Sequence, residues 1–311
     1  MTDPDRSPLA PWGVMLPNFN PFTLDPWPYL DVVRAVEEAG FDAGWVGDHL
    51  AFHPPILEAT NALAAAAAVT SRLKLGFAVL LAAMRQPVWL AKAIATIDHL
   101  APGRLIVGVG AGGEHPQEWA AAGAEVVNRG RRLDEILTVL PALLGGRTVD
   151  HQGPTLTVQA PALRPPVSAL PPLVVGGRSD AALRRAARFG EGWLGVWVSP
   201  EGFRRSCDLL AELAAELGRP CPEPMLLAFT AIGDDMDGCG RDAARLYRGQ
   251  YNLDYESVER WTLTGPVESI AEQLDAYRQV GATSFALIPS RPDLIGQVEQ
   301  LAVVRSLFGQ E

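Results

Sequence analysis

Short apolar runs recur along the chain, and each is followed by a segment whose apolar positions have helical spacing. Eight such runs occur, at residues 12–16, 41–47, 73–81, 104–109, 173–175, 192–198, 225–232 and 284–288. Most of the runs are continuously apolar instead of alternating, which is typical of strands buried on both faces of a parallel sheet. Eight strand–helix units in a chain of 311 residues predict an α/β fold of the (β/α)8 TIM-barrel type.

Two segments do not fit this repeat: residues 145–172, which are rich in Pro and Gly, and residues 233–265. We expect both to be insertions in a single domain that spans residues 1–311. Long loops of a barrel commonly form the walls of its site, so we expect the insertions at the C-terminal face.

The composition narrows the class of partner. A formal net charge of -10 argues against nucleic acid or an anionic membrane as the main partner, because a polyanion would be repelled. No apolar stretch approaches the ~20 residues needed to span a bilayer, and the first residues lack the pattern of a signal peptide. We expect a cytoplasmic protein that acts on a small-molecule substrate. A homodimer is compatible with the sequence.

Metal chemistry is not predicted. The three cysteines are far apart and form no CxxC pair. His49, His53 and His115 could suggest a metal site, but barrel hydrolases usually take paired ligands from one strand, and the chain has neither HxH nor HExxH. We therefore expect no metal ligand among these residues.

Polar residues follow the second apolar run at the point where it ends. In the stretch GWVGDHLAFH, Asp48 and His49 come directly after the apolar residues. The active site of a TIM barrel lies at the C-terminal ends of its strands, so both side chains belong at the barrel mouth. His49 could exchange a proton there, and a hydrogen-bonded structural histidine is the alternative.

A glycine-rich stretch, GVGAGG at residues 108–113, follows the fourth run and matches GxGxxG. A dinucleotide-binding fold would need an acidic residue at the end of a strand about 20 residues later. The acidic residues at that distance, Asp134 and Glu135, have helical spacing and do not end a strand, so a dinucleotide-binding fold is not favoured. We expect instead that the glycines let a flat ring or a phosphate come close to the backbone. Glu114 and His115 come next and are candidates for proton exchange or for a helix cap.

The stretch VGGRSDAAL predicts an anion site. A strand ends at Gly176 and Gly177, Arg178 and Ser179 follow, and a helix begins near Asp180. Backbone N–H groups and the positive end of the helix dipole would meet where a phosphate could bind, with Arg178 as a fixed cation. An ordinary turn in which Ser179 is the N-cap is the alternative.

Together these motifs resemble the luciferase-like oxidoreductases, a family of (β/α)8 enzymes that use FMN or the deazaflavin coenzyme F420. The resemblance rests on GFDAGWVGDHL, SRLKLGFAVLL, RQPVWLAKAIATIDHLAPGRLIVGVGAG, RGRRLDEIL, VGGRSDAALRRAARFGEGW and TGPVESIAEQLDAYRQVGATSFAL, and it extends over nearly the whole chain. It implies a cofactor ring in the barrel mouth.

The resemblance also implies roles for individual residues. Asp48 and His49 look like the pair that lies against the ring in the deazaflavin branch, where a non-prolyl cis peptide in the third strand corresponds to Ala78–Val79. Gly110 and Gly112 resemble glycines that pass close to the cofactor. The phosphate grip corresponds to Gly176, Gly177, Arg178 and Ser179.

On the substrate side the chain departs from its relatives. Many of them carry a Trp shortly after the Asp–His pair, where this chain has Phe52 and His53, and a Trp where this chain has Gly113. Both departures leave more room over the ring. We expect the substrate pocket to be formed by Asn18, Phe52, His53, His115 and Trp197.

The favoured function is hydride transfer between coenzyme F420 and a small organic substrate. His49 would move the accompanying proton, Asp48 would orient His49 or bind the ring, and Glu114 is a second candidate acid. An FMN-dependent monooxygenase that uses O2 is one alternative, and a non-catalytic flavin-binding protein is another.

Two groups of basic residues bear on the acidic tail of F420. We expect a positive rim from Arg178, Arg184 and Arg185 near one helix start. The run RGRR at residues 129–132 is short and has no interleaved aromatic residues, so a solvated helix start or a contact to the acidic tail is favoured over nucleic-acid binding.

Overall fold

The computed structural model describes residues 9–113 and 115–308. Eight parallel strands close into a barrel in the order β1, β2, β3, β4, β7, β8, β9 and β11, and β11 pairs with β1. The strands are β1 (Trp12–Met15), β2 (Ala43–Val46), β3 (Lys74–Phe77), β4 (Leu105–Val109), β7 (Leu173–Gly176), β8 (Gly192–Val196), β9 (Glu223–Ile232) and β11 (Ser284–Pro289). The predicted TIM barrel is confirmed.

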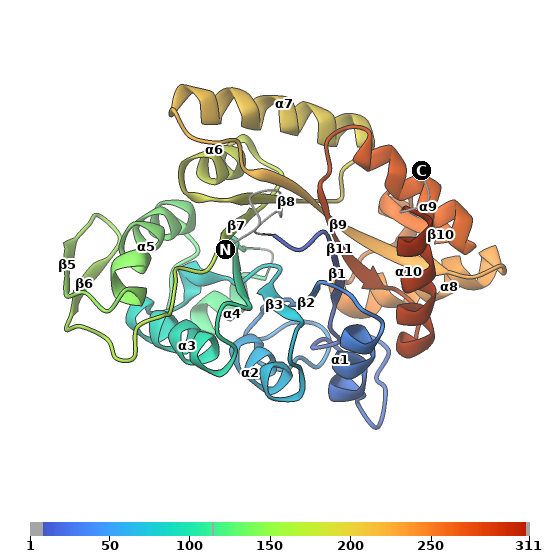
Figure 1. Cartoon of the computed structure of the whole chain (residues 1–311), viewed down its shortest axis with the longest axis horizontal. Helices are drawn as coiled ribbons and strands as arrows, with labels where there is room; N and C mark the ends of the chain where they lie inside the picture. The colour runs from blue at the N-terminus through green and yellow to red at the C-terminus, as the bar shows by residue number, and fades with distance from the viewer. Residues whose placement is uncertain (1–8, 114, 309–311) are drawn as a thin grey trace.

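Helices surround the strands on the outside of the barrel (Figure 1). They are α1 (Tyr29–Glu38), α2 (Ala59–Val69), α3 (Pro87–Leu100), α5 (Arg129–Leu144), α6 (Asp180–Phe189), α7 (Pro200–Glu216), α9 (Val267–Arg278) and α10 (Leu294–Leu307). Further helical segments are α4 (Pro116–Ala121), α8 (Met236–Tyr251), η1 (Ala82–Met84), η2 (Tyr255–Ser257) and η3 (Glu259–Trp261). In the part of the chain that the structure describes, no helix is both long and apolar enough to cross a membrane.

The interior of the barrel is filled by side chains. Trp45 points inward from β2, and the neighbouring strands carry Gly13 and Gly76 beside it. A Cβ at Gly13 would lie 2.1 Å from Trp45 Nε1, and one at Gly76 would lie 2.2 Å from the Trp45 ring. These two glycines therefore make room for the indole, and the barrel has a packed core that confines any site to the mouth.

At the end of the barrel opposite the mouth, arginines bind the last carbonyl groups of helices. Arg104 donates to Ala67 O in the last turn of α2 at 3.2 Å, and also to Leu73 O directly before β3 at 3.1 Å. Arg219 donates to Ala187 O at 2.8 Å, and Arg305 donates to Ala39 O at 3.1 Å. Helix C-terminal carbonyls lack intrahelical partners, so these contacts stabilise the ends of α2, α6 and α1.

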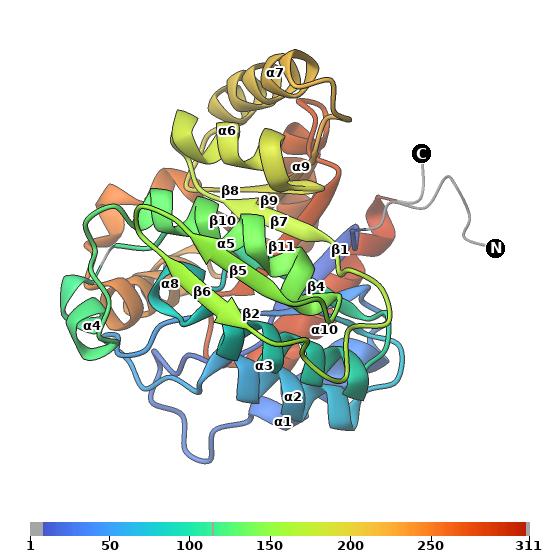
Figure 2. The same cartoon turned by 90° about the vertical axis from the view of Figure 1, so that its left-hand side faces the viewer.

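The first insertion forms an antiparallel hairpin of β5 (Val149–Gln152) and β6 (Thr157–Ala160). The hairpin lies along the outside of α5 in both views (Figures 1 and 2). Glu135 of α5 accepts hydrogen bonds from the N–H and the hydroxyl of Thr155, at 3.1 and 2.6 Å. The hairpin contributes no residue to the lining of the cavity described below, so it supports α5 and not that wall.

The second insertion has a different position. It contains α8 and β10 (Thr262–Gly265), which extends the sheet by pairing in parallel with the second half of β9. Leu246, Gln250 and Tyr251 of α8 line the cavity at the barrel mouth. This insertion therefore forms part of the cavity wall.

Candidate active site

A cavity of about 180 Å³ opens where the barrel strands end. Met15 at the end of β1, Val196 at the end of β8 and Pro289 at the end of β11 contribute to its lining, and most of the lining side chains are apolar. The predicted site residues that line it are Asp48, His49, Ala78, Val79 and Trp197. The cavity therefore lies at the predicted C-terminal face.

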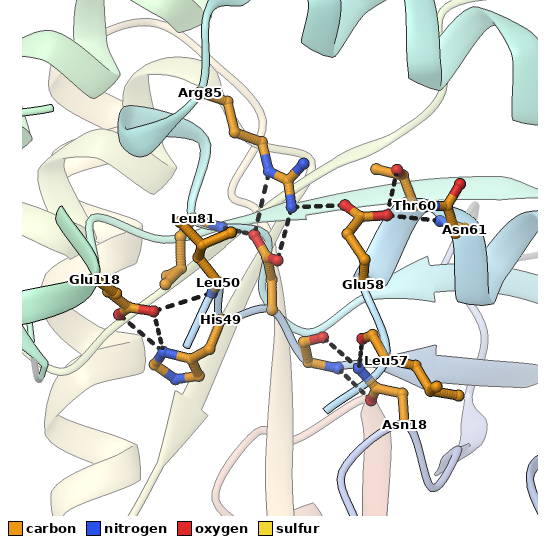
Figure 3. A network of polar contacts seen from close by, with 12 residues as sticks. Asn18, His49, Leu50, Leu57, Glu58, Thr60, Asn61, Leu81, Arg85 and Glu118 are labelled. Carbon is orange, nitrogen blue, oxygen red and sulfur yellow. Dashed lines mark hydrogen bonds and ion pairs between the residues drawn. The ribbon is translucent and has the colours of Figure 1, made fainter. Parts of the chain in front are cut away.

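His49 is held by an acid that comes from a different element. Its Nδ1 lies 2.9 Å from Oε1 and 3.1 Å from Oε2 of Glu118, the second of which also accepts the Leu50 N–H at 3.1 Å (Figure 3). Only 8% of His49 and 1% of Glu118 are exposed. A carboxylate beside Nδ1 selects the tautomer with the proton on that nitrogen and fixes the ring orientation.

Sequence reasoning missed Glu118. The residue lies on α4, which begins at Pro116, and it is separated from His49 by 69 positions. An acid in the first turn of a helix is usually a contribution to the helix dipole, so its type and position gave no specific signal. Only the spatial meeting of α4 with the loop after β2 identifies it.

Asp48 has partners of its own. Its Oδ2 accepts the Leu81 N–H at 2.9 Å, and its Oδ1 accepts from Arg85 Nη2 at 2.7 Å. Arg85 Nη2 also lies 2.9 Å from Oε1 of Glu58 (Figure 3). Glu118 makes the contact that orients His49, which was one of the two roles predicted for Asp48, and the other role, contact with the cofactor ring, stays a prediction. Asp48 ties the end of β2 to the segment after β3.

The surroundings of Arg85 and Glu58 favour their charged forms. Burial alone would lower the pKa of Arg85, but the charges of Asp48 and Glu58 outweigh burial and raise it. Burial favours the neutral form of Glu58, yet hydrogen bonds from Asn61 and Thr60 and the charge of Arg85 lower the pKa of Glu58 below its ordinary value. The loops after β2 and β3 are therefore joined by ion pairs.

The peptide bond between Ala78 and Val79 is cis, which confirms its predicted position. The side chain of Val79 fits against two glycines of neighbouring strands. A Cβ at Gly110 would lie 2.5 Å from Val79 Cγ2, and one at Gly176 would lie 2.7 Å from Val79 Cγ1. Both positions are therefore glycine because Val79 occupies the space, a reason that the sequence alone did not reveal.

The turn before α6 has the features of an anion site and of a helix cap. Ser179 Oγ accepts the Ala182 N–H at 3.3 Å, so Ser179 is the N-cap of α6. Gly177 has φ +136°, a conformation that other residues rarely adopt. The guanidinium carbon of Arg178 lies 5.4 Å from the centre of the Trp197 ring. Arg178 thus lies between the start of α6 and a wall of the cavity.

The predicted positive rim is only partly present. Arg185 is 9% exposed and forms an ion pair with Asp134 of α5, so its charge is balanced within the protein. Arg184 is exposed and lies 3.9 Å from Asp180, the first residue of its helix. Of the three arginines, Arg178 is the one that contacts the cavity wall.

The basic run at the start of α5 fixes nearby loops. Arg129 Nε donates to Gly112 O at 2.9 Å, and Arg132 Nε donates to Ala83 O at 2.8 Å. Gly112 has φ +60°, so the glycine there permits the turn that Arg129 holds. These contacts support the loops after β4 and β3.

Three predicted substrate-side residues form an aromatic cluster beside the cavity. Phe52 stacks on His49 with ring centres 3.8 Å apart and an interplanar angle of 9°. His53 and His115 have ring centres 5.4 Å apart, and Phe52 contacts Tyr251 edge to face at 5.9 Å. Phe52 therefore covers one face of the His49 imidazole.

Asn18 and Glu114 complete the predicted set. Asn18 is fully buried, and its amide binds the C=O of Gly47 at 2.8 Å and the N–H of Gly47 at 3.2 Å (Figure 3). It holds the loop that carries Asp48 and His49 and is not among the lining residues. Glu114 lies outside the described residues. Within residues 9–113 and 115–308, no cluster of His, Cys, Asp and Glu is suited to a metal ion.

Comparison with known proteins places this site in a family context. The chain is 34% identical over 304 residues to the F420-dependent glucose-6-phosphate dehydrogenase of Beutenbergia cavernae, over 86% of this chain and 88% of that protein. A solved F420-dependent secondary alcohol dehydrogenase, in complex with an F420–acetone adduct, matches with a TM-score of 0.83 at 19% identity, over 95% and 98% of the two chains.

A third similar protein was solved with FMN instead of F420. The oxygenating constituent of 3,6-diketocamphane monooxygenase from Pseudomonas putida, solved in complex with FMN, has a TM-score of 0.74 at 17% identity, over 94% of this chain and 97% of that one. The model of the luciferase-like monooxygenase family matches residues 23–284. That match covers more than half of the chain, so the protein belongs to the luciferase-like monooxygenase family and is an oxidoreductase.

Proposed function

We propose that the protein transfers a hydride between coenzyme F420 and a small organic substrate bound at the barrel mouth. The observation that carries the proposal is the His49–Glu118 pair, which lies at the cavity beside the Ala78–Val79 segment. The dehydrogenase relative and the alcohol dehydrogenase structure, both named for F420, support the choice of cofactor.

The residues of the mouth fit a flat ring with a phosphate group. Ala78 and Val79 supply an apolar floor, and Trp197 supplies an aromatic wall. The N-terminus of α6 and Arg178 would hold the phosphate, because N–H groups and the helix dipole favour an anion there. When bound, the deazaflavin supplies the hydride chemistry.

His49 handles the proton in this proposal. Glu118 holds the proton on Nδ1, so Nε2 is the nitrogen that exchanges a proton with the substrate oxygen. The stacked Phe52 ring and the burial of His49 keep water from one face of the imidazole. Asp48 acts as a positioning residue that joins the loops after β2 and β3 through Arg85.

An FMN-dependent monooxygenase is the second candidate. The observation that favours it is the pairing of Arg185 with Asp134, which removes a cation from the predicted rim for the acidic tail of F420. FMN has a phosphate and no such tail, so Arg178 and the start of α6 would suffice. A deazaflavin does not activate O2, and the cofactor therefore decides the reaction type.

Titration of the purified protein with each cofactor tests the proposal. We expect F420 to bind with a micromolar dissociation constant, followed by its fluorescence, and reduced F420 to be oxidised when an enone or ketone is added. Micromolar binding of FMN without binding of F420, together with O2 consumption by reduced FMN, would reverse the assignment.

A further inference from the structure

The cavity extends from His49 into a region lined by apolar side chains. Two walls form this region, one from the segment after β1 and one from α8. The side chains that define it are Phe19, Phe22, Leu24, Trp27, Leu246 and Tyr251. Neither Lys nor Arg occurs among the described residues that line the cavity.

Several polar side chains of the lining have partners inside the protein, whereas Trp197 Nε1 is buried without a hydrogen-bond partner among the described residues. Asp48 is paired with Arg85, as described above. The amide of Asn20 both donates to Leu24 O, at 3.0 Å, and accepts the Leu24 N–H, at 2.8 Å. Gln250 Nε2 donates to the hydroxyl of Tyr251 at 3.0 Å. His49, whose Nδ1 is held by Glu118, and Trp197, through Nε1, both line the cavity and can meet a polar group of a ligand.

The two walls are fixed and form a built pocket. Backbone bonds join the first wall to the loop after β2: Leu57 N–H donates to Asn18 O at 2.8 Å, and Asn20 N–H donates to Pro55 O at 3.0 Å. Arg245 of α8 donates to Phe22 O at 3.0 Å and so joins the second wall to the first.

We propose that the substrate is an uncharged, mainly apolar molecule that presents one carbonyl or hydroxyl group to His49. This inference rests on the proposed function. In the direction of reduction, the carbonyl carbon accepts a hydride and the oxygen accepts a proton by way of His49. The C=O π bond is lost, new C–H and O–H bonds form, and the reduced deazaflavin is oxidised. Oxidation of a secondary alcohol is the reverse.

A phosphorylated or carboxylated substrate does not suit this pocket. An anion placed between the two walls would lose its water without gaining a cation, which is strongly unfavourable. The chain has only two lysines. Lys74 begins β3 at the end of the barrel opposite the mouth, and Lys92 donates to Arg164 O. The substrate class therefore differs from the glucose 6-phosphate in the name of the dehydrogenase relative.

Calorimetric titration with matched ligands tests the inference. The probes are neutral alicyclic ketones (cyclohexanone, 4-methylcyclohexanone and camphor), the anion 4-oxocyclohexanecarboxylate, and glucose 6-phosphate, each with and without oxidised F420. We expect at least one neutral ketone to bind on the order of 100-fold more tightly than either anion. Equal or tighter binding of an anion, or no binding of any ketone, would overturn the inference.

Turnover separates this inference from the proposed function. If a neutral ketone binds but is not reduced with F420, the result contradicts the proposed reaction and supports the inferred substrate class. If glucose 6-phosphate is oxidised with F420, the result supports the cofactor assignment and contradicts the inferred substrate class.

Two matched variants locate the site. Leu24→Arg places a cation in the half-buried wall, and we expect ketone binding to weaken by at least about tenfold while the carboxylate binds more tightly. Leu30→Arg is the control, because Leu30 of α1 is 36% exposed and does not line the described cavity. Circular dichroism checks that both fold. Unchanged binding in a folded Leu24→Arg protein would show that the ligand lies elsewhere.

Discussion

His49 and Glu118 act as one unit because each depends on the other. Glu118 is almost fully buried, and its oxygens contact only the histidine and the Leu50 N–H among the hydrogen bonds of the described residues. Without the carboxylate the imidazole loses the contact that selects its tautomer, and without the imidazole the carboxylate has nothing to orient. The pair thus follows the logic of a base and its orienting acid.

A double-mutant cycle measures this coupling. We expect His49→Ala and Glu118→Gln each to lower kcat, by at least about tenfold for His49→Ala, and the double variant to be no slower than His49→Ala alone. The reason is that the acid acts through the histidine. Steady-state kinetics with saturating F420 supply the values.

The matched control is His99→Ala, because His99 is an exposed histidine in the last turn of α3. Its kcat should equal that of the unmodified protein. If the effects of His49→Ala and Glu118→Gln multiply instead, Glu118 acts independently of the histidine and the paired role is wrong.

The sequence predicted part of this site. Asp48 and His49 could be placed at the mouth because a strand end fixes the position of the residues that follow it. Glu118 could not be placed, since the partner of His49 depends on how α4 packs against a loop 69 positions away. The glycine at position 110 was recognised, but its neighbour Val79 depends on pairing between strands.

The loops after β2 and β3 are joined through Arg85, which bridges Asp48 and Glu58. Glu58 is also the N-cap of α2, where its carboxylate accepts the Asn61 N–H at 2.8 Å. One acid thus begins a helix and holds the arginine that fixes the site loop. A change at Glu58 should therefore affect stability in a pH-dependent way.

Glu58→Gln tests this link. The lowered pKa means that ionised Glu58 contributes stability above its ordinary value of 4.5, and the contribution is lost as the pH falls through the folded-state pKa. We expect Gln to cost no more than about 1 kcal/mol at pH 7, because 36% of the Glu58 side chain is exposed and water screens the pair. Urea unfolding at neutral and acidic pH measures the difference, which should shrink below pH 4.5.

Asp31→Asn is the control for Glu58→Gln. Asp31 pairs with Arg34 on the surface of α1, and its side chain is 70% exposed. Its replacement should leave the free energy of unfolding unchanged at both pH values. An equal cost of the Glu58 variant at acidic and neutral pH would mean that its charge is not what stabilises the loop.

The order of strands and helices was largely readable from the sequence. Each of the eight barrel strands overlaps a predicted apolar run, and three of them extend one or two residues beyond it, because strands buried on both faces are mostly apolar. The β5–β6 hairpin and β10 were not predicted as elements. Their strands have four residues each, and such short segments carry too few periods for a pattern to be recognised.

The molecule divides its tasks between the two ends of the barrel. The mouth carries the cavity, the His49–Glu118 pair and the cis peptide. The opposite end carries arginines that bind helix carbonyls. In TIM barrels the first face serves chemistry and the second serves stability.

Arg104→Gln tests this division. Arg104 donates to two backbone carbonyls and to Thr70 Oγ1, and burial lowers its pKa. Loss of these charged hydrogen bonds should cost about 2 kcal/mol of unfolding free energy. The dissociation constant for F420 should stay within about twofold of the original, because the site is at the other end. A large loss of cofactor affinity in the folded variant would contradict the separation.

The close fit of Val79 between Gly110 and Gly176 has a consequence for how such a scaffold can diversify. The floor of the mouth is a pair of methyl groups that three adjacent strands position together. A shorter side chain at position 79 would enlarge the cavity without moving the neighbouring strands. A longer one would require the backbones at Gly110 and Gly176 to move apart. A smaller side chain at position 79 is therefore a more accessible way to change the shape of the cavity than a larger one.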